Sequence, residues 1–546
     1  MVRIRKIEIR NFRSIRSLDW TPSAGINCLV GPGDSGKSSI LDAIDLCLGA
    51  RRNLSFGDTD FFGLDVTQPV IISLTVGALP DALKNLDAYG DFLRGFDAAT
   101  AQVEDEPRAG IETALTLRLT VASDLEPNWT LFSERAQLLG LERALPWKDR
   151  VALAPARIGS YANTNLSWTR GSVLNKLSEE RANLGAELAR AAREARANFG
   201  TQAAAQLAES LGIVTATATS LGVPVGTSAQ ALLDSHSVSI SDGAIALHNE
   251  AGVPLRCLGT GSARLLVAGL QRAAAEAATI ALVDEVEYGL EPHRLVRLLD
   301  SLGAKDPALP LQVFMTTHSP VAIRELSGRQ VFVVRSSLAG HQVHNVGVAD
   351  DVQSTIRADP EAFLAKSIIV CEGASEVGFA RGLDQYWASQ RHQSFLAYGG
   401  AYVNVGGGDP DKCYARGTAL RKLGYRVMVL VDADKVPNQE SVDALRAAGG
   451  EDLTWRPGRA LEDELFLSLD DGAIHALLQQ AVEFVGEELV NANIQSQSNG
   501  AKTLNSVFGE GKFESIAKDI VGPNLGTADG AFVALVEQLF RWTHAA

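Results

Sequence analysis

The sequence has only five cysteines, and they form neither a CxxC pair nor the spacing of a zinc site. This usage fits a reducing cytosol, and the spacing speaks against a zinc module. A run of about 18 apolar residues is absent, and the N-terminus lacks the apolar core of a signal peptide. We therefore expect a soluble cytoplasmic protein without a membrane partner.

An excess of basic residues is also missing, because 50 Lys and Arg stand against 65 Asp and Glu, a net charge of −15. The chain as a whole therefore lacks the positive charge typical of nucleic-acid-binding proteins. Local basic patches and a carboxylate-rich metal site are still compatible with this net charge. Apolar residues make up 46% and charged residues 21% of the 546 residues. These shares exclude a mostly disordered chain and a collagen-like fibre. At roughly 150 residues per domain, the length predicts three or four domains.

Short apolar runs separated by helix-length stretches predict an α/β fold. Strands are expected at Ile26–Val30, 70–77, 113–122, Ile280–Val283, 312–315, 330–334, Ser367–Cys371, 402–405 and Arg426–Val431. The three after residue 350 predict a second, parallel sheet with crossover helices. Between about residues 171 and 211 the chain is rich in Ala, Glu and Arg. This stretch predicts a helical insertion, which is either a dimer contact or an ordinary surface helix pair.

Residues 31–38 fit the phosphate-binding loop G-x-x-x-x-G-K-[ST], between a predicted strand and an apolar helical pattern. The glycines let backbone N–H groups face the phosphates, Lys37 reaches the β- and γ-phosphates, and the Ser38 hydroxyl faces Mg²⁺. We expect this loop to bind ATP with Mg²⁺. Its predicted nucleotide-binding residues are Gly31, Gly33, Ser35, Gly36, Lys37, Ser38 and Ser39.

Two acids end the apolar strand Ile280–Val283, as in a Walker B motif. Asp284 is expected in the Mg²⁺ shell and Glu285 beside the attacking water. A solvated acidic turn is the alternative, and a second anion cradle at Gly261 and Ser262, which opens a helix, argues against it. His318 follows another strand at the place expected for a γ-phosphate sensor, although a lone histidine is usually structural.

Together these motifs resemble an ABC-type ATPase of the SMC and recombination-repair branch. The resemblance implies that the helix at Gly261 and Ser262 in one subunit completes the ATP site of another. It therefore implies a homodimer or a higher homo-oligomer. The signature departs from the family, because it reads Leu-Gly-Thr-Gly-Ser where the family has Leu-Ser-Gly-Gly.

Acidic residues also follow the strands predicted in the C-terminal part. The carboxyl ends of parallel strands are where open α/β sheets bind ligands. Carboxylates without His or Cys favour Mg²⁺, Mn²⁺ or Ca²⁺ over zinc. The candidates are Glu372, Glu376, Asp432, Asp434 and Glu462, with Asp463 and Glu464 as less secure neighbours.

The strand–Glu-Gly and strand–Asp-x-Asp pair resembles a Toprim domain. An ABC ATPase joined to a Toprim domain is similar to the OLD (overcoming lysogenization defect) nuclease family, including the nuclease subunits of Gabija antiphage systems. This resemblance implies that Glu372, Glu376, Asp432, Asp434 and Glu462 are metal ligands. It also implies a catalytic lysine, either Lys512 or Lys502. The expected domains are the ATPase at 1–165 and 231–350, the helical insertion at 166–230 with a possible dimerisation role, and the Toprim domain at 351–546.

The resemblance predicts an ATP-regulated, divalent-metal-dependent DNA endonuclease that acts in phage defence or DNA processing. Its catalytic groups would be Lys512, with Glu285 and His318 serving ATP hydrolysis. One rival is a non-nucleolytic, SMC-like DNA-repair ATPase that clamps or loads DNA. Another is a subunit of a larger defence complex that needs a partner such as a helicase.

Overall fold

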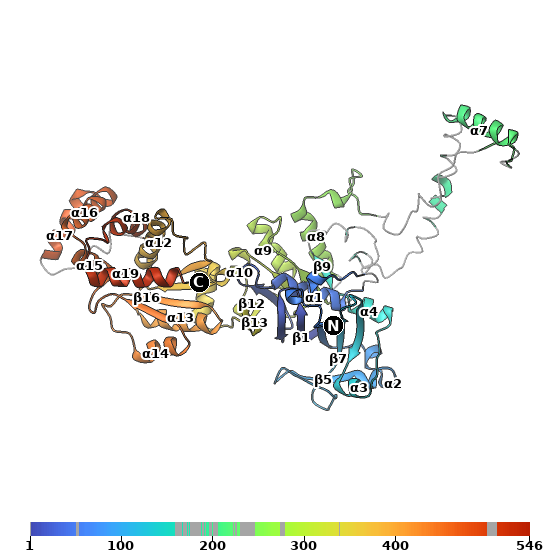
Figure 1. Cartoon of the computed structure of the whole chain (residues 1–546), viewed down its shortest axis with the longest axis horizontal. Coiled ribbons are helices and arrows are strands. Elements are labelled where there is room, and N and C mark those ends of the chain that lie inside the picture. The colour runs from blue at the N-terminus through green and yellow to red at the C-terminus, as the bar shows by residue number, and fades with distance from the viewer. Residues whose placement is uncertain are drawn as a thin grey trace.

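The computed structural model describes residues 2–50, 54–158, 206–221, 246–273, 279–337, 339–498 and 510–545, with scattered positions between 166 and 229. Within these residues the strands form three sheets (Figure 1). Of the predicted insertion at 166–230, helix α7 (Ala208–Ser220) is described, and it stands apart from the sheets in Figure 1. Most of the rest of that prediction, like Lys502, lies outside the described residues.

The first sheet is antiparallel, with the order β2-β1-β4-β7-β5-β6 and β8 paired to β7. Ile7 and Ile9 alternate with polar residues along its N-terminal strand, and they lie with residues of α1 in one core, as does Ile4, which precedes a register shift. This period of two is what half-buried strands show. The strands are β1 (Arg3–Phe12), β2 (Ile15–Trp20), β4 (Val70–Gly77), β5 (Leu93–Asp97), β6 (Gln102–Glu104), β7 (Glu112–Val121) and β8 (Pro127–Phe132).

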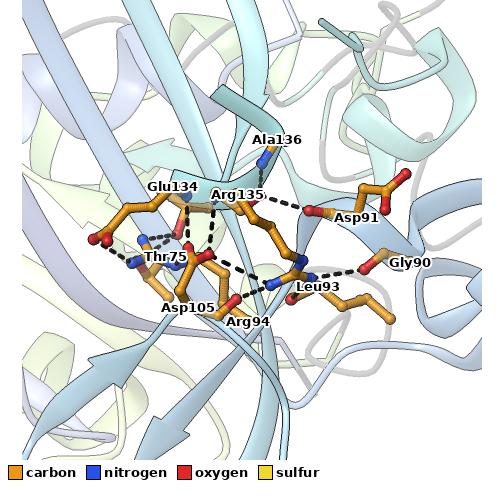
Figure 2. Close-up of polar contacts among 11 residues, drawn as sticks. Thr75, Gly90, Asp91, Leu93, Arg94, Asp105, Glu134, Arg135 and Ala136 are labelled. Carbon is orange, nitrogen blue, oxygen red and sulfur yellow. Dashed lines mark hydrogen bonds and ion pairs between the residues drawn. The ribbon is translucent and has the colours of Figure 1, made fainter. Parts of the chain in front are cut away.

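A polar network holds the far edge of this sheet (Figure 2). Asp105 accepts hydrogen bonds from the backbone N–H groups of Glu134, at 2.6 Å, and Arg135, at 2.9 Å. The buried guanidinium of Arg94 lies 3.6 Å from the same carboxylate. Arg135 also donates to the carbonyl of Gly90 at 2.7 Å. A buried charge is tolerated when it is paired, and Asp105 pairs with the buried Arg94. The same carboxylate binds the start of α3, so it holds that helix against the sheet edge.

The second sheet has the order β13-β12-β3-β11-β10-β9 and is parallel except where β13 pairs with β12. Its interior strand β3 alternates between two cores, with Cys28 and Val30 facing one and Leu29 facing the other. Both faces are therefore covered, as is usual for parallel sheets. The strands are β3 (Ile26–Val30), β9 (Ala156–Ile158), β10 (Ile280–Val283), β11 (Gln312–Thr316), β12 (Val331–Ser337) and β13 (Gly340–Asn345).

The first two sheets are joined at the beginning of the chain. The N–H of Ile4 donates to Oε1 of Gln312 at 2.7 Å, and Nε2 of Gln312 donates back to the Ile4 carbonyl at 2.9 Å. Arg3 donates to the carbonyl of Thr279 at 3.1 Å. These bonds fasten β1 to strands of the second sheet that lie far along the sequence.

The third sheet is fully parallel, with the order β15-β14-β16-β17. Its strands are β14 (Ser367–Cys371), β15 (Gly400–Asn404), β16 (Arg426–Val431) and β17 (Glu451–Thr454). One face continues the core of the second sheet, and the other packs on C-terminal helices (Figure 1). The prediction of a second parallel sheet is confirmed, with residues 402–405 shifted to Gly400–Asn404.

Helices cover both parallel sheets, and no described helix combines the length and apolar character needed to cross a membrane. In the first 345 residues the remaining described helices are α1 (Lys37–Leu48), α2 (Leu86–Tyr89), α3 (Glu134–Leu138), α4 (Trp147–Leu153), α8 (Thr260–Ala273), α9 (Pro292–Ser301) and α10 (Pro320–Glu325). Later helices are α11 (Asp350–Ala358), α12 (Ala374–Ser389), α13 (Asp411–Lys422), α14 (Gln439–Ala447), α15 (Leu461–Ser468), α16 (Asp471–Val485), α17 (Glu487–Ser498), α18 (Glu510–Ile516) and α19 (Gly530–Thr543).

Candidate functional site

The phosphate-binding loop connects β3 to α1 and needs its glycines. Gly31 and Gly36 have φ values of 140° and 85°, which residues with a Cβ rarely adopt. A Cβ on Gly31 would also lie 2.7 Å from the carbonyl oxygen of Val334. The buried Lys37 donates from Nζ to the carbonyls of Gly31, at 3.1 Å, and Pro32, at 2.7 Å. Burial lowers the pKa of this lysine.

The other predicted loop residues surround the first turn of α1. Gly33 is exposed, and the buried Ser35 accepts from Nζ of Lys37 at 3.4 Å. The hydroxyl of Ser39 lies 3.5 Å from that of Ser14, in the turn between β1 and β2. Gly36 is the N-terminal cap of α1, so the free N–H groups of the first turn begin at this glycine.

The acid at the end of β10 lies beside α1. Oδ1 of Asp284 accepts from Ser38 Oγ at 3.1 Å and from Thr316 Oγ1 at 2.6 Å. A hydroxyl and a carboxylate placed together in this way fit the oxygen ligands that Mg²⁺ takes. Thr316 ends β11, and sequence reasoning missed it because nothing marks a single threonine at a strand end.

Glu285 has a strained backbone, with a φ of 47° that is unusual for a residue other than glycine. Its N–H donates to Thr316 Oγ1 at 2.8 Å, and its carbonyl accepts from Arg264 at 3.0 Å. Arg264 lies in α8, is fully buried, and also donates to the carbonyls of Asp284 and Tyr288. Such strain persists where surrounding contacts impose it, and it is concentrated at functional sites. The carboxylate itself is exposed.

The histidine after β11 is positioned by an acid that sequence reasoning missed. Oε1 of Glu287 accepts from the backbone N–H of His318 at 2.7 Å, and Oε2 accepts from Thr317 Oγ1 at 2.6 Å. The imidazole of His318 is exposed. Glu287 therefore fixes the turn that carries His318 and leaves the ring open to a ligand.

The predicted signature residues open α8. A Cβ on Gly261 would lie 2.4 Å from the carbonyl oxygen of Gly289, so glycine allows close packing here. Oγ of the half-buried Ser262 accepts from Arg294 at 3.1 Å. The first turn of α8 contains no acidic residue, which suits an anion at this helix end. The contact of Ser262 with a second subunit stays a prediction.

The acids of the third sheet converge at the carboxyl ends of its strands. Glu372 follows β14 and accepts through Oε2 from the N–H of Asp432, which follows β16, at 3.2 Å. Asp432 in turn accepts from the N–H of Leu461 at 3.0 Å, next to Glu462. Glu376 accepts from the N–H of Gly373 at 2.7 Å. Strand ends and helix starts thus bring acids from four segments to one place.

Burial and mutual repulsion disfavour the charged forms of these acids. Burial, then the charges of Glu376, Glu372, Glu462 and Asp434, raise the pKa of Asp432. Burial, followed by Glu462 and Glu372, raises that of Glu376. Asp434 is exposed. Among the described residues, no three His, Cys, Asp or Glu side chains are arranged so that they could hold a metal ion as they stand.

The less secure acids have structural partners. Glu464 is fully buried and pairs with Arg456 at 2.5 Å and Arg459 at 3.2 Å. Asp463 accepts from the N–H of Ala460 at 3.1 Å and caps α15. Both side chains therefore stabilise α15, and Glu462 is the residue of this helix that stays a candidate metal ligand.

The late lysine lies on a helix next to the acids. Lys512 belongs to α18, which packs along α12, the helix of Glu376, and its side chain lies outside the described part. A Cβ on Gly382 would lie 2.2 Å from the carbonyl oxygen of Glu514, so glycine lets the two helices approach closely. Sequence reasoning missed Asp409, whose charge helps raise the pKa of Glu372 after burial and Asp434.

Comparison with known proteins shows which protein family the N-terminal part of the chain resembles. The model of the family described as "AAA domain, putative AbiEii toxin, Type IV TA system" matches residues 26–324, more than half of the chain. The DNA replication and repair protein RecF of Chlorobium luteolum is 46% identical over 89 residues, which are 16% of this chain and 24% of RecF. The chromosome partition protein Smc of Methanocaldococcus jannaschii is 41% identical over 64 residues, 12% of this chain and 6% of Smc.

The chain therefore spans about a quarter or less of these curated relatives. Among solved structures, the Smc head bound to the C-winged helix domain of ScpA is 16% identical. It covers 62% of this chain and 96% of its own, with a TM-score of 0.35.

Proposed function

The chain belongs to the family described as AAA domain, putative AbiEii toxin, Type IV TA system, and we propose that its ATPase domain regulates a divalent-metal-dependent DNA endonuclease in the C-terminal part. The observation that carries the nuclease part is the meeting of Glu372, Glu376 and Asp432 at the carboxyl ends of parallel strands. Burial and the neighbouring carboxylates raise the pKa values of Asp432 and Glu376, and a bound cation would relieve this repulsion.

In the ATPase half, each residue has a role that its contacts support. Lys37 and the N–H groups of the first turn of α1 bind the phosphates of ATP. Ser38 and Asp284 hold Mg²⁺, and Glu285 orients the attacking water. His318 contacts the γ-phosphate, with Glu287 holding its backbone. The strained φ of Glu285 is held by Arg264, so the water-orienting carboxylate is linked to the start of α8.

In the C-terminal half, Glu372, Glu376, Asp432, Asp434 and Glu462 would hold Mg²⁺ or Mn²⁺ at the sheet edge. Such ions would supply a Lewis acid that activates a water and stabilises the leaving oxygen of a phosphodiester. The N–H groups of Leu461, Gly373 and Asp432 each engage one carboxylate oxygen, which orients the acids before a cation arrives. Lys512 supports the negative charge on the scissile phosphate.

Assembly is part of the same proposal. The α8 start of one subunit, at Gly261 and Ser262, faces the ATP of another in a homodimer or higher oligomer. DNA is the substrate, phage defence or DNA processing is the setting, and a helicase subunit is a further partner. The likeness to the DNA replication and repair protein RecF supports the DNA part of this proposal.

A second candidate is a non-nucleolytic DNA-repair ATPase that clamps or loads DNA. The identity of 41% to a chromosome partition protein and of 46% to RecF favours it. In this candidate, the acids of the third sheet serve stability or regulation, and no DNA strand is cut.

A plasmid assay separates the two candidates. Purified wild type is incubated with supercoiled DNA and Mg²⁺ or Mn²⁺, with and without ATP. The nuclease requires metal-dependent nicking that Asp432→Asn reduces at least about a hundredfold, because it removes a charged ligand, while ATP hydrolysis stays within about twofold. Asp443→Asn, an exposed acid on α14, is the matched control and should cut normally. DNA retention without cutting under every metal condition would instead establish the clamp.

A further inference from the structure

His341 is a buried histidine without a hydrogen-bonding partner among the described residues. It lies on β13, is 6% exposed, and neither Nδ1 nor Nε2 has a partner there. Buried polar groups are nearly always satisfied, so an unsatisfied ring calls for an explanation. Burial lowers the pKa of the imidazole and so favours its neutral form, in which one nitrogen can donate a hydrogen bond and the other can accept one.

The ring lies against the phosphate-binding loop. A Cβ on Gly36 would be 3.0 Å from Nε2 of His341 and 3.2 Å from both Cδ2 of that ring and Oγ of Ser14. His341 and Ser14 therefore meet at the residue that caps α1. They come from different parts of the chain and converge on the backbone that binds phosphates.

The sheet order gives the nucleotide site two distinct sides. The loop leaves β3, and β11 then β10 lie on one side, with Asp284 following β10. On the other side lie β12 then β13, which carries His341. Ser38 bonds to Asp284, whereas Ser39 lies against Ser14. Successive residues leave a helix about 100° apart, so these two serines point in different directions, one toward Asp284 and the other toward Ser14.

If Ser38 and Asp284 hold the metal and the terminal phosphate, as proposed above, the rest of a nucleotide is expected to leave the loop on the other side, where Ser14 and His341 lie. A cavity of about 350 Å³ lies on that side between β2 and β13, lined by Ser17, Asp19 and His341 among others.

We propose that this cavity takes the nucleoside of ATP and that His341 hydrogen-bonds it, which makes His341 a specificity-determining residue of the nucleotide site. The inference rests on ATP binding at the phosphate loop and adds the part of the site that recognises more than phosphate. Polar groups of a ribose or a base satisfy the ring nitrogens, and Ser17 and Asp19 offer a hydroxyl and a carboxylate on the same wall.

The experiment compares two probes on the full chain by calorimetry, Mg²⁺-ATP and Mg²⁺-tripolyphosphate, which has the phosphates but no nucleoside. In His341→Phe, which keeps a ring but no hydrogen bond, we expect ATP affinity to fall about tenfold while tripolyphosphate affinity stays within about twofold. His341→Gln keeps an amide near the position of Nε2 and should restore most of the ATP affinity. His475→Phe, an exposed histidine on α16, is the control and should bind both probes normally.

Equal losses for both probes in His341→Phe would overturn the nucleoside assignment, because the ring would then only support the loop. Unchanged ATP binding would overturn it as well.

Retained tripolyphosphate binding shows that the variant loop is folded. If His341→Phe does not fold, the wild type and a His341→Ala variant decide the question. Wild type that binds ATP no more tightly than tripolyphosphate overturns the inference, as does an undiminished preference in a His341→Ala variant. Failure of wild type to bind either probe would instead overturn the phosphate site itself.

Discussion

The guanidinium carbon of Arg335 lies 3.7 Å from the centre of the Tyr425 ring. Arg335 belongs to β12, which pairs with the strand that leads into the phosphate-binding loop. Tyr425 is fully buried and immediately precedes β16, the strand that Asp432 follows. A cation–π contact thus joins the strand next to the predicted ATP site to the start of the strand that precedes Asp432.

This contact predicts that two substitutions of Tyr425 lower the free energy of unfolding by different amounts. Tyr425→Phe removes the hydrogen bond that the hydroxyl donates to the Phe363 carbonyl at 2.9 Å, and should lower the free energy of unfolding by about 1 kcal/mol. Tyr425→Leu also removes the ring beneath Arg335 and should cost about 3 kcal/mol. Urea denaturation followed by tryptophan fluorescence measures both. Tyr398→Phe, at a more exposed ring, should change little, and equal costs at the two positions would contradict the role of Tyr425.

Substitutions in the predicted ATP site should affect ATP binding and ATP hydrolysis separately. Glu285→Gln should bind ATP but hydrolyse it about a hundredfold more slowly, since the amide keeps the shape and loses the base. Lys37→Ala should weaken ATP binding itself by removing a charge-assisted contact to the phosphates. Calorimetry and phosphate release measure the two steps. Turnover by Glu285→Gln at the wild-type rate would show that Glu285 does not assist the water.

The carboxylate cluster predicts an unusual pH dependence of stability. The pKa values of Asp432 and Glu376 are raised in the folded chain above the value near 4 of an exposed carboxyl. Between the ordinary and the raised value the folded state holds more protons than the unfolded state, so stability without metal falls as the pH rises through this window. Asp432→Asn should flatten the fall in melts with EDTA from pH 5 to pH 8.

Mg²⁺ should counteract that loss, because it replaces protons as the positive charge among the acids. Its stabilising effect on the wild type is expected to be larger at pH 8 than at pH 5, and small in Asp432→Asn. A metal effect of the same size in both proteins would place the ion elsewhere. Ca²⁺ provides a comparison that binds oxygen ligands in a looser geometry.

The start of α8 predicts a shared ATP site. Ser262→Arg places a bulky side chain at the proposed subunit interface and leaves each phosphate loop intact, so ATP binding should persist and hydrolysis should be lost. Mixing this variant with Lys37→Ala creates one site with both lesions and one with neither. Partial ATPase activity should return if the two sites work independently. Lack of recovery despite demonstrated subunit exchange would argue for coupled sites or against the shared arrangement.

The sequence alone predicted those strands and acids whose positions a local run of apolar residues marks. Apolar runs located β3, β10, β14 and β16 with their observed bounds. Acids directly behind such strands were found because the strand marks the position, as with Glu372 and Asp432. Strands β6 and β8 gave no comparable signal, since β6 has only three residues and just one residue of the two strands is buried.

Residues that act across long sequence separations could not be found in this way. Arg264 is one arginine of a helix until the structure shows its bonds to the turn after β10. His341 contacts Gly36 only because the sheet order brings β13 next to the loop. Glu464 has the same side chain as Glu462, and only its ion pairs with two arginines, seen in the structure, distinguish it.

The paired hydrogen bonds between Ile4 and Gln312 have a consequence for the synthesis of the chain. Gln312 is synthesised only after some three hundred further residues have followed β1, the strand to which it bonds. Until then β1 can pair with β2 and β4, whereas β3 lacks its neighbours β11 and β12. Contacts of such long range are slow to close, and unpaired strand edges invite aggregation. The nucleotide site can therefore mature only late in translation, after β12 has emerged.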